Sequence, residues 1–138
     1  MTVSFTVPGN PVPKGRPRVT RYATFTPQST VDYENRVRDA WQASGASAFP
    51  AACPLTVEVR AYFPMPKGTS KRRRVLLEDS PHIKHRGDID NVVKAVLDAL
   101  NGRAFPDDCA VCRIVASKAM SETPRTEVHI QNFEEVSL

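Results

Sequence analysis

Apolar and polar residues alternate along several parts of the chain with the two-residue period of a β-strand. The alternation is strict over Leu55–Phe63 and also present over Val3–Val7. Two further segments near the C-terminus, Cys109–Ser117 and Thr126–Gln131, have the composition of strands. Because only Met120–Pro124 and a few flanking residues separate these two, the sequence predicts that they form a hairpin.

Two other segments carry apolar residues at the spacing of an α-helix. The first helix is expected to begin at Ser29 or Thr30 and to end near Ser44. Its apolar positions, which include Tyr33 and Trp41, are expected to face the core rather than to stack on nucleic-acid bases. A third, shorter helix is expected at Thr69–Leu77, inside the long irregular stretch 64–87.

The second of the two main helices is expected to have about three turns. Asp90 is expected to be its N-cap, and Asn101-Gly102 marks its end. The element order is therefore strand, helix, strand, loop, helix, strand, strand. We expect a small α+β fold in one domain spanning residues 1–138, with a mixed four-stranded sheet and two main helices.

The polar side of the second helix carries its candidate chemistry. At about 100° per residue, Asp90, Asn91, Lys94 and Asp98 fall within one arc opposite the apolar stripe. Asp88 stands just before this arc. The arrangement predicts carboxylates at the start of the helix with an ammonium group one turn behind them.

The short connection after this helix leads to two more carboxylates, Asp107 and Asp108. Extended chain covers about 3.3 Å per residue, so the connection is long enough to run back along most of the helix. The sequence then predicts that Asp107-Asp108 meet Asp88 and Asp90. Converging carboxylates with only oxygen ligands suit Mg²⁺ or Mn²⁺. Asp98, two turns from Asp90, is not counted as a ligand of the same ion.

Each of these residues also has a purely structural interpretation. Asp90 capping the helix and Asp88 favouring the helix dipole are as probable as ligand roles when each residue is taken alone. Pro106-Asp107-Asp108 also has the composition of an ordinary turn, and Lys94 with Asp98 has the spacing of a surface ion pair. The functional hypothesis rests on their combination.

The charge is unevenly distributed along the chain. Residues 1–86 hold fourteen Lys and Arg against six Asp and Glu, whereas residues 87–138 hold five against nine. A basic body around an acidic centre is expected of a metal-dependent phosphodiesterase, since cations attract the polyanion and carboxylates hold the metal. The candidate DNA-binding cations are Lys14, Arg16, Arg18, Arg21, Lys67, Lys71, Arg72, Arg73, Arg74, Lys84 and Arg86. His82 and His85, in the same long loop, are expected to be exposed.

The cysteine content and the lack of long apolar segments bear on the cellular location of the protein. Three cysteines cannot all pair within one chain, which favours a reducing cytosol, and Cys109 and Cys112 are expected to pack in the core rather than to bind zinc. The sequence has neither a secretion-signal pattern at its start nor an apolar run near twenty residues. We expect no membrane association and a location in the cytoplasm.

With these residues identified, the chain resembles the RusA-type Holliday junction resolvases, particularly their phage and prophage members. The likeness lies in VPGNPVPKGRPR, in HIKHRGDIDNVVKAVLDALNG and in the following FPDDCAV. It implies acidic site residues at Asp88, Asp90 and Asp108, with Asp107 adjacent, and an essential basic residue at Lys94. Where the family often has proline before these acids, this chain has Gly87.

The resemblance further implies a homodimer that binds four-way junctions in DNA recombination and repair. It would make paired, symmetric nicks with Mg²⁺, or with Mn²⁺ as a substitute. Two alternatives to such a nuclease remain at this point. The first is a non-catalytic nucleic-acid-binding module whose acids are caps and turns, and the second is a hydrolase of small phosphate esters. The last is disfavoured because the basic half carries more charge than a small anion requires.

Overall fold

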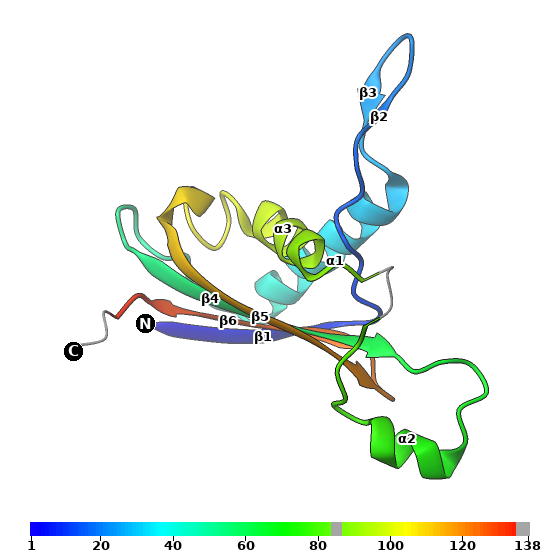
Figure 1. Cartoon of the computed structure of the whole chain (residues 1–138). Coiled ribbons are helices and arrows are strands. Elements are labelled where there is room, and N and C mark those ends of the chain that lie inside the picture. Colours follow the sequence, from blue (N-terminus) through cyan, green and yellow to red (C-terminus); the bar gives the residue numbers. More distant parts are fainter. Residues whose placement is uncertain (84–86, 135–138) are drawn as a thin grey trace.

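The main sheet has four strands in the order β1-β6-β4-β5 in the computed structural model, which describes residues 1–83 and 87–134. Strands β4 and β5 are parallel, and the other neighbours are antiparallel. Helices α1 (Gln28–Ala43) and α3 (Ile89–Leu100) lie together over one face of this sheet (Figure 1). The predicted α+β class, with a mixed four-stranded sheet and two main helices, is confirmed. The strands are β1 (Thr2–Pro8), β4 (Leu55–Pro64), β5 (Val111–Ser121) and β6 (Arg125–Asn132).

The alternation in β1 and β6 places their apolar residues on the same, helix-covered face. In the antiparallel pairing, inward residues of one strand stand opposite inward residues of the other, so the core is continuous across the pair. These partners are Val3 with Ile130, Phe5 with Val128 and Val7 with Thr126. The buried Thr126 hydroxyl is satisfied by the Tyr33 hydroxyl at 2.6 Å.

The aromatic residues of α1 belong to this core, as predicted. Tyr33 is fully buried, and Trp41 meets Phe5 edge to face at a ring-centroid distance of 5.9 Å. The buried side of α3 consists of Val92, Val93, Ala95, Val96, Ala99 and Leu100. Because this apolar side packs inward, the polar side of α3 is left facing outward.

The predicted hairpin between the last two strands is wrong. Strand β6 pairs with β1 and β4, whereas β5 pairs with β4 and, through an isolated bridge at Ala119, with Pro81. The short connection after Ser121 therefore crosses the end of β4 instead of joining two neighbours. Parallel strands need a crossover of a dozen or more residues, and the segment between β4 and β5, which contains α2 (Lys71–Leu77) and α3, provides it.

Two helix starts also differ from the prediction. Helix α1 begins after Pro27, which has no side chain able to cap, while the hydroxyl of Thr30 accepts a hydrogen bond from the Gly15 N–H at 2.9 Å. The expected short helix is present as α2, where the Ser70 hydroxyl accepts from the Arg73 N–H. A small hairpin of β2 (Arg18–Val19) and β3 (Thr24–Phe25) was not expected, and it extends away from the sheet and helices (Figure 1).

The cysteine prediction is wrong as well. Cys109 and Cys112 are both exposed and unpaired by disulfides. Cys109 lies in a short 3₁₀ turn (Asp108–Ala110) before β5 begins, and Cys112 lies on β5, which forms one edge of the sheet. An edge strand next to a turn has few neighbours to cover it, so these side chains are not enclosed.

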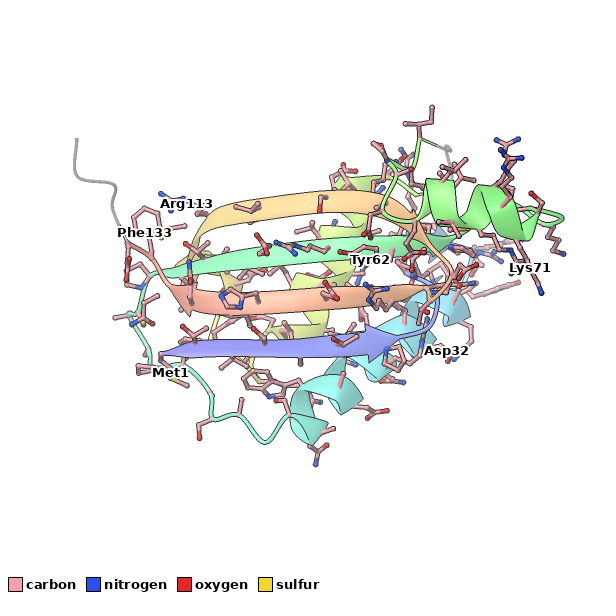
Figure 2. The ribbon with its side chains drawn as sticks, turned by 90° about the horizontal axis from the view of Figure 1, so that it is seen from below. Met1, Asp32, Tyr62, Lys71, Arg113 and Phe133 are labelled. Atoms are coloured by element: carbon pink, nitrogen blue, oxygen red, sulfur yellow. The ribbon has the colours of Figure 1, made fainter. Side chains whose placement is uncertain are left out.

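The face of the sheet opposite the helices is open (Figure 2). Side chains on this face form local ion pairs, Arg60 with Glu58 and Arg125 with Glu127, each at 3.1 Å. Arg125 also lies over the Tyr62 ring, 4.0 Å from its centroid. Polar and paired charges of this kind let one face of a mostly antiparallel sheet remain in water. Over the described ranges, none of the helices combines the length and apolar character needed to span a bilayer.

Candidate active site

The outward side of α3 and the neighbouring strand β5 form a groove of about 440 Å³. Three carboxylates and one ammonium group lie along it, above a floor of aliphatic side chains. The predicted polar arc of the helix is therefore present and opens onto this groove. Its polar residues are Asp90, Lys94, Asp98 and Asp108, and its apolar residues are Ile89, Val93, Leu97, Ile114 and Ala116.

Contacts with β4 and β5 fix the position of the segment that leads into α3. Lys118 donates from Nζ to the carbonyl of Gly87 at 2.9 Å. Gly87 itself is buried against the stacked rings of Phe63 and His82, whose centroids are 4.4 Å apart. A Cβ at position 87 would come within 2.9 Å of the Phe63 ring, so the absence of a side chain is a packing requirement. His82 is thus partly enclosed, contrary to the expectation of an exposed loop histidine.

Neither acid at this end caps the helix. Asp88, not Asp90, stands at the N-cap position, and its side chain makes no capping hydrogen bond. Asp90 lies in the first turn, where its charge gains about 0.3–1 kcal/mol from the helix dipole. The predicted N-cap role of Asp90 is therefore wrong. Within the described residues the side chains of Asp90 and Lys94 have no hydrogen-bonded or ion-pair partner, so both side chains are available to a ligand.

The other end of the groove is formed by the connection after α3. This connection turns tightly, with the Gly102 N–H donating to the Phe105 carbonyl, and does not run back along the helix. The Asp108 N–H then donates to Oδ1 of Asn101 at 3.2 Å, which places Asp108 beside the C-terminal end of α3. The prediction that Asp107-Asp108 return to Asp88 and Asp90 is thus wrong. Asp108 lines the same groove as Asp90 and Asp98, and the negative charge of Asp98 is close enough to act on it.

The pKa values of the adjacent acids Asp107 and Asp108 are shifted in opposite directions. Partial burial, followed by the neighbouring Asp107 and Asp98 carboxylates, raises the pKa of Asp108 above its usual value. The Cys109 N–H, which donates to Asp107 Oδ1 at 3.1 Å, holds the pKa of Asp107 below its usual value. Burial and neighbouring negative charge therefore both disfavour the ionised form of Asp108, and a nearby cation would favour it.

Lys14 is not placed as the sequence predicts. Its Nζ lies 2.5 Å from Glu34 of α1 and 3.0 Å from Asp98 of α3, and its backbone N–H donates to the Asn91 carbonyl at 2.8 Å. Because two carboxylates already occupy this ammonium group, it is not free to bind a phosphate. The residue instead joins the start of the basic segment to α1 and α3.

Comparison with known proteins decides the family. The model of the family described as endodeoxyribonuclease RusA matches residues 8–131, nearly the whole described chain. The chain belongs to the RusA family. It is also 31% identical to the uncharacterized protein YqaN of Bacillus subtilis (strain 168), over 94% of this chain and 95% of that protein. Membership of the RusA family supports assignment as a DNA endonuclease.

RusA-family membership gives the groove residues a chemical context. The family's nucleases generally depend on a divalent metal. Among the described residues, no group of three or more His, Cys, Asp or Glu side chains is drawn together as a metal site. The donor chemistry nevertheless fits a hard cation, since the groove offers only carboxylate oxygens and one of them, on Asp108, is held near unfavourable negative charge.

The candidate DNA-binding cations of this RusA-family chain lie in two places. One group is on or beside the β2–β3 hairpin, and the other is on or beside α2, beyond the end of β4 (Figure 1). All those with described positions are exposed. The first group is Arg16, Arg18 and Arg21, and the second is Lys67, Lys71, Arg72, Arg73 and Arg74. The predicted contacts Lys84 and Arg86, and also His85, lie outside the described residues.

Proposed function

We propose that this chain is a divalent-metal-dependent endonuclease that resolves four-way DNA junctions by paired nicks. The observation that carries the proposal is the groove along α3, where carboxylates that do not cap the helix lie beside Lys94, which has no ion-pair partner in the part of the chain that the structure describes. A chain that only bound DNA would gain nothing from such acids, because they repel phosphates. The RusA-family match over residues 8–131 supports the same reaction class.

The proposed metal ligands are Asp88, Asp90 and Asp108, with Mg²⁺ as the ion and Mn²⁺ as a substitute. Because Asp88 and Asp90 are at the start of α3 and Asp108 is beside its C-terminal end, Asp108 would complete the site from the second chain of a homodimer. Such an ion would lower the pKa of a bound water and polarise the scissile phosphate. Lys94 lies one turn after Asp90 on the same side of α3 and lines the groove. Its ammonium group would offset the negative charge that grows on the phosphate during cleavage.

DNA binding is assigned to the exposed cations of the hairpin and of α2, with Lys84 and Arg86 proposed from the sequence alone. Two of the three groove acids, Asp90 and Asp98, are on α3. The cations are on the β2–β3 hairpin and on or beside α2, both of which stand away from α3 (Figure 1). Phosphates flanking the scissile one can therefore be neutralised without the cations blocking the carboxylates. The large number of cations favours a polyanion over a small phosphate ester.

We further propose that the active form is a homodimer. A four-way junction presents two equivalent strands, and a pair of sites related by twofold symmetry matches them. Analytical ultracentrifugation at micromolar concentration, alone and with junction DNA, tests this. A monomeric mass under both conditions contradicts the dimer while leaving the nuclease assignment intact.

The decisive experiment is Asp90→Asn. Because Asp90 does not cap α3, the change costs only its dipole term, about 0.3–1 kcal/mol, and the protein stays folded. Junction binding stays equal or becomes tighter, because one negative charge leaves the groove. Nicking falls by roughly 100-fold or more, since even residues that merely hold metal ligands in place cost about 10- to 100-fold when changed.

Asp39→Asn is the matched control, because Asp39 is an exposed acid of α1 that is not part of this groove. It should nick at the parental rate. Each protein is melted thermally, tested for junction binding without metal, and assayed for nicking with Mg²⁺, Mn²⁺ and a chelator. Near-parental nicking by Asp90→Asn, or metal-independent nicking, would refute the site. Junction binding without nicking by the parent would favour the non-catalytic binding module.

A further inference from the structure

The hairpin of β2 and β3 carries three exposed apolar side chains. Tyr22 at its tip is 89% exposed, Val19 is 79% exposed and Phe25 is 46% exposed. Figure 1 shows the hairpin standing clear of both the sheet and the two main helices. These side chains therefore contribute little to the core, so packing does not explain why they are apolar.

The tip has a defined conformation. The Thr20 N–H donates to the Ala23 carbonyl at 2.8 Å, and the Ala23 N–H donates back to the Thr20 hydroxyl at 3.1 Å. Arg21 and Tyr22 are thus the two residues at the turn, and the Arg21 guanidinium carbon lies 6.0 Å from the Tyr22 ring centroid. None of these backbone bonds uses the Tyr22 ring, so the ring can be changed without removing what holds the turn.

The charge around these apolar residues identifies the kind of partner. Residues 11–27 contain no Asp or Glu and four cations, of which Lys14 is occupied by carboxylates of α1 and α3. The other three, Arg16, Arg18 and Arg21, are exposed. A partner must therefore be anionic and also offer flat apolar surface. Nucleic acid whose bases are not stacked on both faces combines these two properties.

We propose that the tip of this hairpin enters the branch point of the DNA, where Tyr22 stacks on an exposed base and the flanking arginines bind phosphates. This inference rests on the function proposed above and adds to it a determinant of branched over linear DNA. In continuous duplex both faces of each base are covered, so stacking Tyr22 there would require separating a base step. At a branch point the stack is already interrupted, so the ring gains contact without that cost.

The test measures junction and duplex affinity by fluorescence anisotropy with the full chain and without metal, so that no DNA is cut. Tyr22→Ala should raise the Kd for a four-way junction by roughly 5- to 100-fold, the range expected when one stacked base is lost. Its Kd for a linear duplex should stay within about twofold of the parent. Tyr22→Phe keeps the ring and is the matched control, with both Kd values near parental.

Arg18→Ala should behave differently, because a phosphate contact carries no preference for a branch. Both Kd values should rise together, and the slope of log affinity against log salt should fall by about one for each substrate. Thermal melting of each variant checks that the fold is retained. Ultracentrifugation of the parent and Tyr22→Ala without DNA tests whether the tip instead contacts a second copy of the chain.

The outcomes separate this inference from the function on which it rests. If the parent prefers the junction and Tyr22→Ala prefers it equally, only the role of the hairpin tip is overturned. If Tyr22→Ala loses affinity equally for both substrates, or loses dimer mass without DNA, the base-stacking role is likewise overturned. If the parent shows no preference for a junction over a duplex, both proposals fall. Selective loss of junction affinity, restored in Tyr22→Phe, supports the proposal.

Discussion

The substitution Lys14→Met separates the structural role of this lysine from the phosphate-binding role that its neighbours in the sequence suggest. Methionine has a similar length and keeps the aliphatic stem, so the change removes mainly the charge. In the structure the ammonium group lies between Glu34 at 2.5 Å and Asp98 at 3.0 Å. The side chains of Lys14, Glu34 and Asp98 are 20%, 11% and 34% exposed.

These exposures set the expected magnitude. Breaking a fully buried pair by removing one partner costs about 3–5 kcal/mol, while an exposed pair contributes about 0–1 kcal/mol. Glu34 keeps a second cation, Arg38, at 3.7 Å, so it is not left wholly without compensation. We therefore expect Lys14→Met to lower the free energy of unfolding by about 2–3 kcal/mol. For a chain of this length that corresponds to a fall in Tm of roughly 10 °C.

The pH dependence of the effect has a definite sign. Burial lowers the pKa of Lys14, but the hydrogen bonds and charges of Glu34 and Asp98 outweigh it, and the net pKa is raised above 10.5. A raised folded-state pKa gives stability that is fully present below the unfolded-state value and lost as pH rises through the folded-state value. The stability difference between parent and variant should thus be constant from pH 7 to about 10 and shrink only above pH 10.5.

Urea unfolding of the parent, Lys14→Met, Glu34→Gln and the double variant measures the coupling directly. Lys67→Met is the matched control, because Lys67 is exposed and is assigned to DNA binding. It should leave stability within about 0.5 kcal/mol and lower the salt slope of junction affinity by about one. The reasoning is refuted if Lys14→Met shows this control behaviour, a small stability change with a lower salt slope.

Two further predictions concern α2 and its contact with β5. Glu78 accepts hydrogen bonds from the Ser121 hydroxyl at 2.7 Å and the Glu122 N–H at 2.8 Å, and these bonds, in that order, lower the pKa of Glu78. Its stabilising effect should be fully present above pH 4.5 and weaken as pH falls through the lowered value. Because Glu78 is exposed to solvent, Glu78→Ala should cost about 0.5–1 kcal/mol at pH 7 and less near pH 2. Chemical denaturation at the two pH values measures this, and an equal cost at both would contradict it. Replacing Arg72, Arg73 and Arg74 together by Ala should weaken junction binding and reduce its salt slope by about three, as fewer counterions are released; an unchanged slope would show that these arginines do not contact DNA.

The local elements were predictable because each follows from the spacing of neighbouring side chains. The alternation in β1 and β4 and the helical period of α1 and α3 depend on which face meets the core, and that face is the same whatever the strand order. The β2–β3 hairpin was missed because each strand has only two residues, too few to show a period.

Strand order could not be obtained in the same way. A short connection between two strands is typical of a hairpin, but three residues also suffice to cross the end of one intervening strand, here β4. The burial pattern contains the relevant signal. Inward residues of β6 are almost completely buried, as in a central strand, while β5 leaves Ile114 and Val115 about half exposed, as at an edge. That difference depends on long-range pairing, which periodicity does not report.

The same distinction between local and long-range information applies to the groove. The helical period correctly places Asp90, Lys94 and Asp98 on one side of α3, but it cannot show what faces each of them. Its distance along the helix argues against Asp98 as a ligand of the same ion as Asp90. The structure places Asp98 near both the ammonium group of Lys14 and the carboxyl group of Asp108. The charge of Asp98 is therefore shared: it stabilises the link to α1 and raises the pKa of Asp108. If Asp108 binds the proposed cation, Asp98 would influence that carboxylate through its charge without ligating the ion, a role that spacing along the helix alone does not reveal.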